Sequence, residues 1–209
     1  MRFSCTLAAV VIAATTLQAA APTALDSALD RATTAMSGTE ASFTHRFTAK
    51  GFKTSQVEKG MVVFGTLPRM RWSYTSPETK LFVFDGTTSW FYVPGDRQVT
   101  HGRVTEARKR ELPFLLLGDP GARDRAFVVK HQNRGKNVVT TLQPRDRAAT
   151  VQAVTVTIAS STNLIQRIEY TDRDGNQTSF DFSGYRKRAA SAETFSFTPP
   201  AGVQVIQAD

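Results

Sequence analysis

The chain has 209 residues, of which 41% are hydrophobic and 21% charged, and its formal net charge is +8 at pH 7. This length can bury an ordinary hydrophobic core as one domain, and no segment has low complexity or a solenoid-type repeat. The single cysteine, Cys5, lies close to the N-terminus, so the rest of the chain has no disulfide, thiol nucleophile or cysteine metal site.

Residues 1–21 have the pattern of a secretory signal peptide. One cation, Arg2, precedes the apolar run LAAVVIAATTL, and the small residues QAAAP follow it. The run is too short for a membrane span of about 20 apolar residues. Cys5 precedes the run, whereas the lipidated cysteine of a lipoprotein signal would follow it. We therefore expect cleavage between Ala19 and Pro22, export, and a single mature domain over residues 22–209.

Loss of Arg2 with the leader would leave a net charge of +7. In an exported chain, this excess indicates an anionic membrane surface, an acidic partner or simple solubility, and no nucleic acid. The basic runs at 108–110 and 186–188 are short and lie beside loop signals. They are interpreted as solvated surface.

The mature chain begins with a helical pattern. Apolar residues recur at three-to-four spacing at Leu25, Leu29, Ala32 and Met36, and Gly38 is a natural helix stop.

From residue 43 onward the apolar period is two, which predicts strands. The expected strands lie at 43–47, 61–63, 70–74, 81–84, 89–93, 127–129, 138–142, 154–158, 164–170, 180–182 and 195–197. Turn signals separate several of them, including Asp85-Gly86 and the segments 133–135, 144–146 and 172–175. The pattern predicts a mainly β fold, an antiparallel meander of about ten or eleven strands closing into a barrel or strongly curved sheet.

One segment, LPFLLLG (112–118), interrupts the meander. Pro113 can open a helix at its first position, so we expect a short apolar helix. Such a helix must bury Phe114, Leu115 and Leu117, and the concave face of the sheet is the expected surface.

The stretch RMRWSYTSP (69–77) places Met70, Trp72 and Tyr74 on one face of a strand. Phe43, Phe47 and either Trp90 or Tyr92 are expected on the same inner face of the sheet. Aromatic and methionine side chains suit an adaptable apolar pocket, but they equally suit a filled core. Periodicity separates buried from exposed residues and leaves both interpretations open.

Catalysis has little support in the sequence. The three histidines, His45, His101 and His131, lie far apart and lack metal-ligand spacing, and no nucleophile elbow or phosphate-binding loop is present. Most aspartates stand in turns, where they cap their own backbone. Three classes of function remain: a carrier of an amphiphile, a lipid-sensing or interaction domain, and a hydrolase on a β scaffold.

A series of motifs in fixed order resembles one known family. It comprises the block LPRMRWSYTSPETKLFVFDGTTSWFYVPGDRQVT (67–100), the PFLLL segment, Asp172-x-x-Gly-Asn176 and the tail FSFTPPAGVQV (195–205). Together with the leader and first helix, this order is similar to the periplasmic lipoprotein carrier family, LolA. The absence of a lipidated cysteine favours the soluble carrier over the similar membrane-anchored acceptor.

The resemblance implies an incomplete antiparallel β-barrel of about 11 strands, with helices forming a lid over an apolar cavity. It implies a soluble, monomeric periplasmic protein, not an enzyme and without a cofactor, that takes lipoprotein acyl chains from an inner-membrane ABC transporter to an outer-membrane acceptor. On this interpretation the cavity is lined by Phe43, Phe47, Met61, Val63, Met70, Trp72, Tyr74, Leu81, Val83, Trp90 and Tyr92. The lid carries Leu25, Leu29, Met36, Phe114, Leu115 and Leu117.

The sequence departs from the family at one position. The family's best-known form has an arginine immediately before the proline of the block, and this arginine ties the lid to the barrel. Here Leu67 precedes Pro68, and alignment backwards from Trp72 puts Thr66 at that place. Neither side chain donates as a guanidinium does. The sequence therefore leaves open how the lid is held, and whether the cargo is a lipoprotein or another amphiphile such as a glycolipid.

Overall fold

The computed structural model describes residues 28–105 and 113–208. The helical elements are α1 (Ala28–Met36), α3 (Pro113–Leu117), α4 (Pro120–Ala126) and the 3₁₀ helix η1 (Ala192–Phe195). The first six strands are β1 (Thr39–Thr48), β2 (Gln56–Phe64), β3 (Met70–Ser76), β4 (Lys80–Phe84), β5 (Thr88–Val93) and β6 (Gln98–Arg103). The remaining strands are β7 (Phe127–Arg134), β8 (Asn137–Pro144), β9 (Val151–Ala159), β10 (Ile165–Asp172), β11 (Gln177–Lys187) and β12 (Gln204–Gln207).

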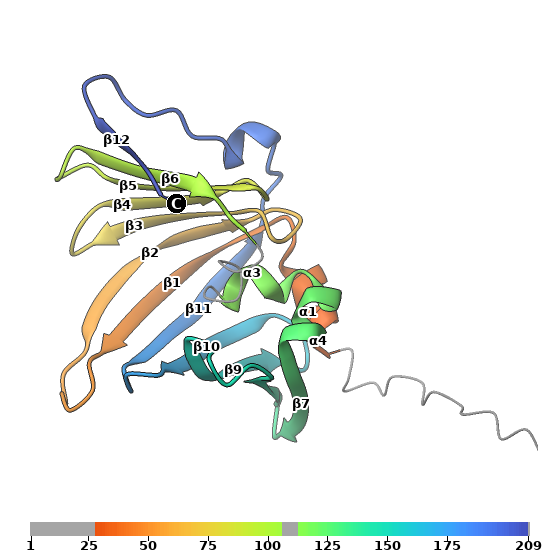
Figure 1. Ribbon diagram of the computed structural model, residues 1–209. Coiled ribbons are helices and arrows are strands. Elements are labelled where there is room, and N and C mark those ends of the chain that lie inside the picture. Colours follow the sequence, from red (N-terminus) through yellow and green to blue (C-terminus); the bar gives the residue numbers. More distant parts are fainter. Residues whose placement is uncertain (1–27, 106–112, 209) are drawn as a thin grey trace, which may run out of the picture.

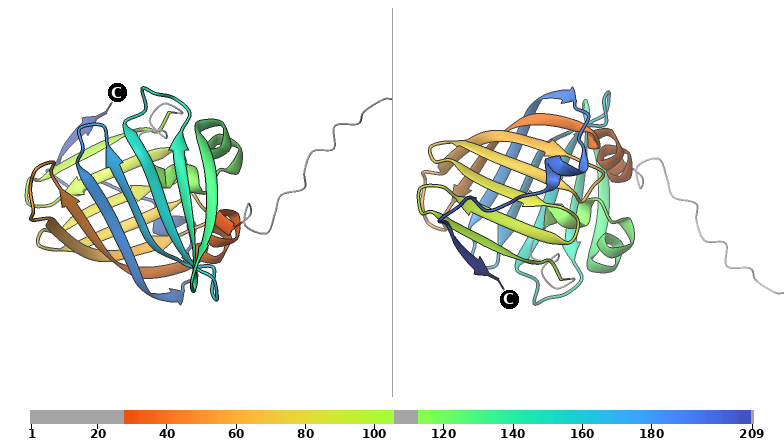
Figure 2. Two further views of the ribbon diagram at one scale, coloured as in Figure 1. Left: turned by 90° about the horizontal axis from the view of Figure 1, so that it is seen from below. Right: turned by 90° about the horizontal axis from the view of Figure 1, so that it is seen from above.

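All the strands of the described residues belong to one 12-stranded sheet, in the order β12-β6-β5-β4-β3-β2-β1-β11-β10-β9-β8-β7. Neighbours are antiparallel except β12, which runs parallel to β6. The sheet curves strongly, and its end strands β7 and β12 are not paired with each other in the described part of the chain (Figures 1 and 2). The predicted mainly β fold with an unclosed antiparallel barrel is therefore confirmed.

Three helices gather at one end of the curved sheet (Figure 1). We refer to α1, α3 and α4 as the lid helices. The predicted short helix exists, since α3 begins at Pro113 and ends at Leu117. Asp119 caps α4, because its side chain accepts a hydrogen bond from the backbone N–H of Ala122 at 2.9 Å, and Pro120 occupies the first turn.

The inner face of the sheet, which the lid helices cover, contains the main hydrophobic core. Strand residues of this cluster include Phe43, Val62, Phe64, Met70, Trp72, Phe84, Val156, Phe180 and Phe182. Leu29 and Met36 of α1 and Leu115 to Leu117 of α3 are buried in the same cluster. The apolar stripe of each helix is thus satisfied by the concave side of the sheet, as the spacing in the sequence predicts.

The outer face of β2 to β6 has a second buried patch, which the C-terminal segment covers. Val63, Val83, Val99 and Phe195 are at most 6% exposed but lie outside the main core cluster. After β11 the chain crosses this face through η1 and returns as β12 beside β6 (Figure 1). The prediction of a strand at 195–197 is therefore wrong. Phe195 ends a 3₁₀ helix and packs on the sheet from outside.

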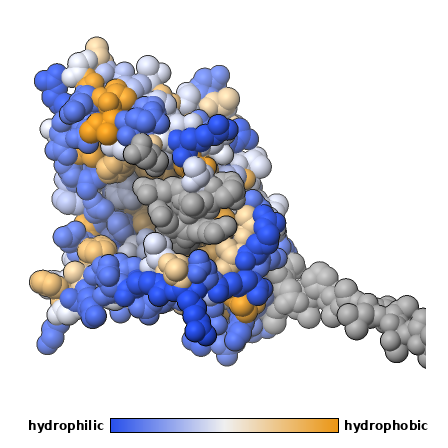
Figure 3. Space-filling view, in the orientation of Figure 1, coloured by the Kyte–Doolittle hydropathy of each residue, from blue (hydrophilic) through white to orange (hydrophobic). Residues whose placement is uncertain are grey.

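In the described residues, no helix has the length and apolar character needed to cross a membrane. On the face seen in Figure 3, hydrophilic residues form most of the margins, and apolar residues gather in patches between them.

Candidate functional site: the aromatic inner face and its lid

An aromatic cluster dominates the inner face where β1, β3 and β11 meet. The ring of Phe43 lies edge-on to Trp72 and to Tyr74, with centroids 5.0 and 4.8 Å apart. Trp72 also contacts Phe180 from β11 at 5.3 Å. Strand pairing explains this meeting, because β1 lies between β2 and β11 and brings Phe43 opposite Phe182. Gly60 leaves room for the cluster, since a Cβ there would lie 2.9 Å from the Phe43 ring.

Phe114 from α3 inserts into this cluster. Its ring packs edge-on against Trp72 at 5.2 Å and against Phe180 at 4.8 Å. Phe114 is only partly buried, whereas Leu115, Leu116 and Leu117 beside it are at most 3% exposed. A lid side chain thus occupies the surface that an apolar ligand would contact, which is the arrangement expected of a lid closed over the inner face.

The inner face contains five of the residues predicted to line a cavity. Phe43, Met70 and Trp72 are buried in the core cluster, Tyr74 packs against it, and Phe47 lies on the same side of β1 as Phe43. Phe180 and Phe182 complete the aromatic wall and were missing from the predicted site. Their alternation in β11 was visible in the sequence, but the pairing of β11 with β1 was not.

Six other residues of the predicted lining lie on the opposite face. The register pairs Val63 with Arg71 and Val83 with Trp90, and both pairs point outward. The set is Met61, Val63, Leu81, Val83, Trp90 and Tyr92. The rings of Trp90 and Tyr92 approach Phe197 at 5.8 and 5.6 Å. These strands are apolar on both faces because each face is covered, so the expectation of a shared face with Trp72 is corrected.

The predicted lid residues divide into described and undescribed positions. Leu29, Met36, Leu115 and Leu117 are buried against the inner face. Phe114 is partly buried there. Leu25 lies outside the described residues.

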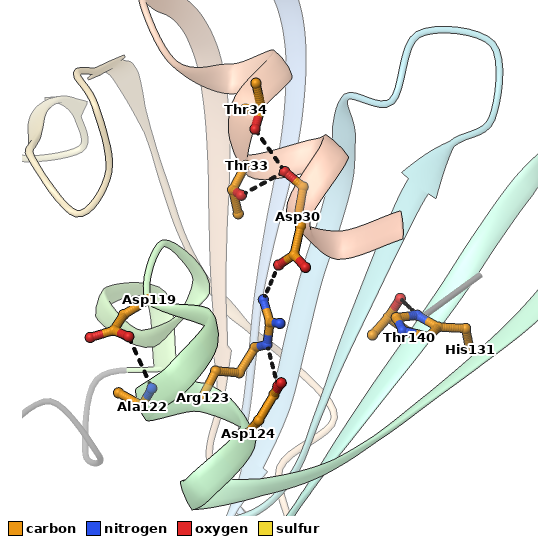
Figure 4. Close-up of polar contacts among 9 residues, drawn as sticks. All are labelled: Asp30, Thr33, Thr34, Asp119, Ala122, Arg123, Asp124, His131 and Thr140. Carbon is orange, nitrogen blue, oxygen red and sulfur yellow. Dashed lines mark hydrogen bonds and ion pairs between the residues drawn. The ribbon is translucent and has the colours of Figure 1, made fainter. Parts of the chain in front are cut away.

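A buried arginine links two of the lid helices (Figure 4). The guanidinium of Arg123, in α4, donates to the Asp30 carboxylate of α1 at 2.7 Å and to Asp124 at 3.0 Å. The Arg123 side chain is 4% exposed, whereas that of Asp30 is 42% exposed. In addition, Arg145 donates to the backbone carbonyls of Asp124 and Phe127, which ties α4 to the sheet. No local pattern in the sequence predicts these ties, because the partners are remote in the chain.

Leu67, one of the two positions where the resemblance would put the latch arginine, makes an apolar contact. It packs against the core cluster. Its Cβ would lie 2.4 Å from a Cβ placed on Gly118, at the end of α3, so the hairpin turn and the lid meet closely there. Close packing that a glycine permits therefore joins the hairpin turn to the lid at this point.

The inner face becomes polar toward the strand ends remote from the lid. His45 stacks on Phe180 at 4.3 Å and bonds through Nδ1 to Glu58 at 2.9 Å, and Lys80 donates to Glu58 at 2.8 Å. Burial alone would raise the pKa of Glu58, but the bonds from Lys80 and His45 outweigh it and lower the pKa. Burial, reinforced by the Glu58 charge, raises the pKa of Tyr74. The apolar wall thus ends at three polar side chains, in which the Glu58 carboxylate is bonded to His45 and Lys80.

No group of three or more histidine, cysteine, aspartate or glutamate side chains that could hold a metal occurs among residues 28–105 and 113–208. The arrangement offers apolar contact area rather than a reactive constellation.

Comparison with known proteins agrees with this site. The sequence profile of the family described as outer membrane lipoprotein carrier protein LolA matches residues 34–198. The chain belongs to the LolA family. An outer-membrane lipoprotein carrier protein of Photobacterium profundum is 32% identical over 148 residues, which cover 70% of this chain and 71% of that protein. The protein of the same name from Xanthomonas axonopodis pv. citri is 27% identical over 180 residues, covering 85% and 86%.

The fold also has a counterpart among solved structures. An uncharacterised conserved protein from Thermus thermophilus superposes with a TM-score of 0.54 at 13% identity, covering 87% of this chain and 97% of that one. Such a low identity supports the fold alone. The LolA membership rests on the sequence, and the aromatic inner face with its lid is the feature that a carrier would use.

Proposed function

We propose that this protein is a periplasmic carrier that shields the acyl chains of lipoproteins on its aromatic inner face. The observation that carries the proposal is the position of Phe114, which the lid inserts between Trp72 and Phe180. The names of the LolA relatives support a lipoprotein as the cargo. On this proposal residues 1–21 are a cleaved leader, residues 22–209 act as one carrier domain, and the protein is not an enzyme.

The proposed contacts with the acyl chains come from the inner face. They are Phe43, Phe47, Met70, Trp72 and Tyr74, with Phe180 and Phe182 completing the wall. Leu29, Met36, Phe114, Leu115 and Leu117 belong to the lid that the chains displace. The six outward-facing residues from Met61 to Tyr92 are not part of this proposal.

The energetics favour a lid that must be displaced. Burying an acyl chain is worth about 0.8 kcal/mol per CH₂, so two or three long chains would yield tens of kcal/mol in total. That total exceeds the range in which non-covalent affinities saturate, about 18 to 21 kcal/mol. Removing Phe114 and its neighbours from the aromatic cluster offsets part of the gain. The remaining affinity is compatible with release.

The proposed partners follow from the family resemblance. A monomeric carrier would receive its cargo from an inner-membrane ABC transporter and pass it to an outer-membrane acceptor. The alternative cargo is another amphiphile such as a glycolipid, because Leu67 and Thr66, the two positions where the family's latch arginine would fall, do not donate as a guanidinium does.

The test uses the two tryptophans, Trp72 and Trp90, which lie on opposite faces. In Trp90→Phe the emission comes from Trp72, and in Trp72→Phe it comes from Trp90. Titration with a long-chain fatty acid should change the Trp72 emission saturably and leave the Trp90 emission unchanged. A response confined to Trp90, or no response at all, would contradict the proposed inner-face site.

Native mass spectrometry of protein purified from its own periplasm identifies the cargo. Triacylated lipoprotein in the bound fraction supports the lipoprotein carrier. Co-purified glycolipid without lipoprotein would select the alternative.

A further inference from the structure

A basic pocket lies on the outer surface beside the lid end of the sheet. Its volume is about 400 Å³, and its cationic lining residues are Arg69, Lys187 and Arg188. Gly38, Gly65 and Phe195 contribute uncharged walls, and none of the lining residues is an aspartate or glutamate. Four segments form it: the turn after α1, the β2–β3 hairpin, the end of β11 with the residues that follow it, and Phe195 of η1.

The cations of this region are only partly neutralised within the protein. Glu40, 7% exposed, binds the guanidiniums of Arg186 and Arg188, which hold the pKa of its carboxyl below its usual value. In the described part of the chain, Arg69 and Lys187 make no ion pair; the Arg69 guanidinium lies 6.0 Å from the ring centroid of Phe195.

A second pocket shares Arg188 with the first and extends the basic surface. It is lined by Arg71, Glu193 and Phe197 among others. Arg71 donates to the backbone carbonyls of Thr194 and Ser196, both at 3.4 Å, and burial together with the positive charge of Arg188 lowers its pKa. The two adjoining pockets thus bring four cations, Arg69, Arg71, Lys187 and Arg188, together with one carboxylate, Glu193, among their lining residues.

We propose that this basic pocket binds the phosphate of an anionic phospholipid and so docks the protein on a bilayer. Guanidinium groups match phosphate oxygens with paired hydrogen bonds, and a pocket of this size admits a phosphoglycerol headgroup. The run at 186–188, interpreted from sequence as solvated surface, thereby acquires a ligand. The excess positive charge, +7 once Arg2 is lost with the leader, favours the same kind of surface.

The pocket lies close to the lid helices, so docking would place the bilayer near the lid. Ser37, another lining residue, follows α1 directly, and the hairpin that supplies Arg69 also contains Leu67, which meets Gly118 just after α3. A bilayer bound here therefore lies against the end of the sheet that the lid helices cover. The use of this contact for loading rests on the proposed carrier function, whereas the binding of the bilayer does not.

The experiment is co-flotation of the exported protein, residues 22–209, with vesicles. One set contains 30% phosphatidylglycerol in phosphatidylcholine, and the other contains phosphatidylcholine alone. The variant Arg69→Gln/Lys187→Gln removes two cations of the pocket and keeps the pairs of Glu40. The control, Lys53→Gln/Lys130→Gln, removes the same charge from exposed positions elsewhere.

We expect binding to the anionic vesicles only. Because each cation near an anionic surface contributes about fivefold, the loss of two should make the pocket variant bind about 30-fold more weakly. The control should change binding by less than about threefold. An equal loss of vesicle binding in the two variants would mean that the bilayer attracts the protein's charge as a whole, and would overturn the pocket as the binding site. Equal binding to both vesicle types would overturn the role of lipid charge.

Two further measurements distinguish a phospholipid from free phosphate and from an acidic protein as the ligand of the pocket. Calorimetric titration with inorganic phosphate should show no binding when the phosphate concentration equals that of the lipid phosphate in the vesicle experiment. Saturable binding of free phosphate at that concentration would show that the pocket does not need a lipid, and would overturn the proposal. Loss of binding to an acidic periplasmic domain in the pocket variant, with vesicle binding unchanged, would assign the surface to a protein. The Trp72 titration should be the same in the pocket variant and wild type, so docking and the carrier function fail independently.

Discussion

The two apolar faces of the β2–β6 region are covered in different ways. The inner face meets the lid helices through side chains, with Phe114 against Trp72 and Phe180. The outer face meets the C-terminal segment through side chains and also through backbone pairing, since β12 joins β6 and Ala208 donates to the His101 carbonyl at 2.7 Å. A cover tied by backbone hydrogen bonds resists removal, whereas a cover held by apolar contacts can be replaced by an apolar ligand. We therefore expect the outer cover to contribute stability and the inner cover to exchange with a ligand.

Phe195→Ala tests the outer cover and has the largest expected effect. Phe195 is 3% exposed, and deletion of a fully packed phenylalanine costs about 3–5 kcal/mol. Urea unfolding should show that loss, while fatty-acid binding per folded molecule stays at the wild-type value. Weaker binding in the folded fraction would show that the outer cover also serves the cargo site.

Phe114→Ala tests the inner cover. Because Phe114 is partly buried, the free energy of unfolding should fall by about 1–2 kcal/mol, less than for Phe195→Ala. Cargo binding or transfer should nevertheless be impaired. Val156→Ala, at a fully buried position on β9, serves as the control and should lower stability without changing cargo binding. If Phe114→Ala unfolds the protein and leaves binding intact, α3 is core and not a lid.

The link between the lid helices can be measured by a double-mutant cycle. Arg123→Gln and Asp30→Asn, alone and together, should give a coupling free energy of about 1 kcal/mol, because the carboxylate partner is partly solvated. Chemical unfolding of the four proteins gives the value. A coupling near zero would mean that α1 and α4 are held by packing alone.

The smallest expected effect is the contribution of Glu58 to the pH dependence of the unfolding free energy. Lys80 and His45 keep the pKa of Glu58 below its ordinary value, so its contribution to stability is complete above that value and is lost as the pH falls through the folded-state pKa. Unfolding free energies of wild type and Glu58→Gln should converge between about pH 5 and pH 3. Their difference at neutral pH should stay below about 1 kcal/mol, since solvent screens the pairs. A gap that widens in acid would contradict the assigned direction.

Much of the fold was predictable because its signals are local. The alternation in RMRWSY put Met70, Trp72 and Tyr74 on one face, and the register confirms it. Pro113 predicted the start of α3. The C-terminal tail was mispredicted, because the alternation of Phe195 and Phe197 follows their packing on the outer face and no strand partner is involved.

Outside the C-terminal tail, where β12 was not predicted, the sequence by itself determined where the strands and turns fall and which side chains share a face within each strand, since these depend on neighbours only a few positions away. Only the tertiary structure decided which face is inside. Where both faces are covered, a run such as LFVF is apolar throughout, so Val83 and Trp90 could not be distinguished from Trp72 by pattern. The Arg123–Asp30 link, the Leu67–Gly118 contact and the basic pocket join segments far apart in the chain. Their partners meet because the strand order and the position of the lid helices bring them together, and no local pattern records that order.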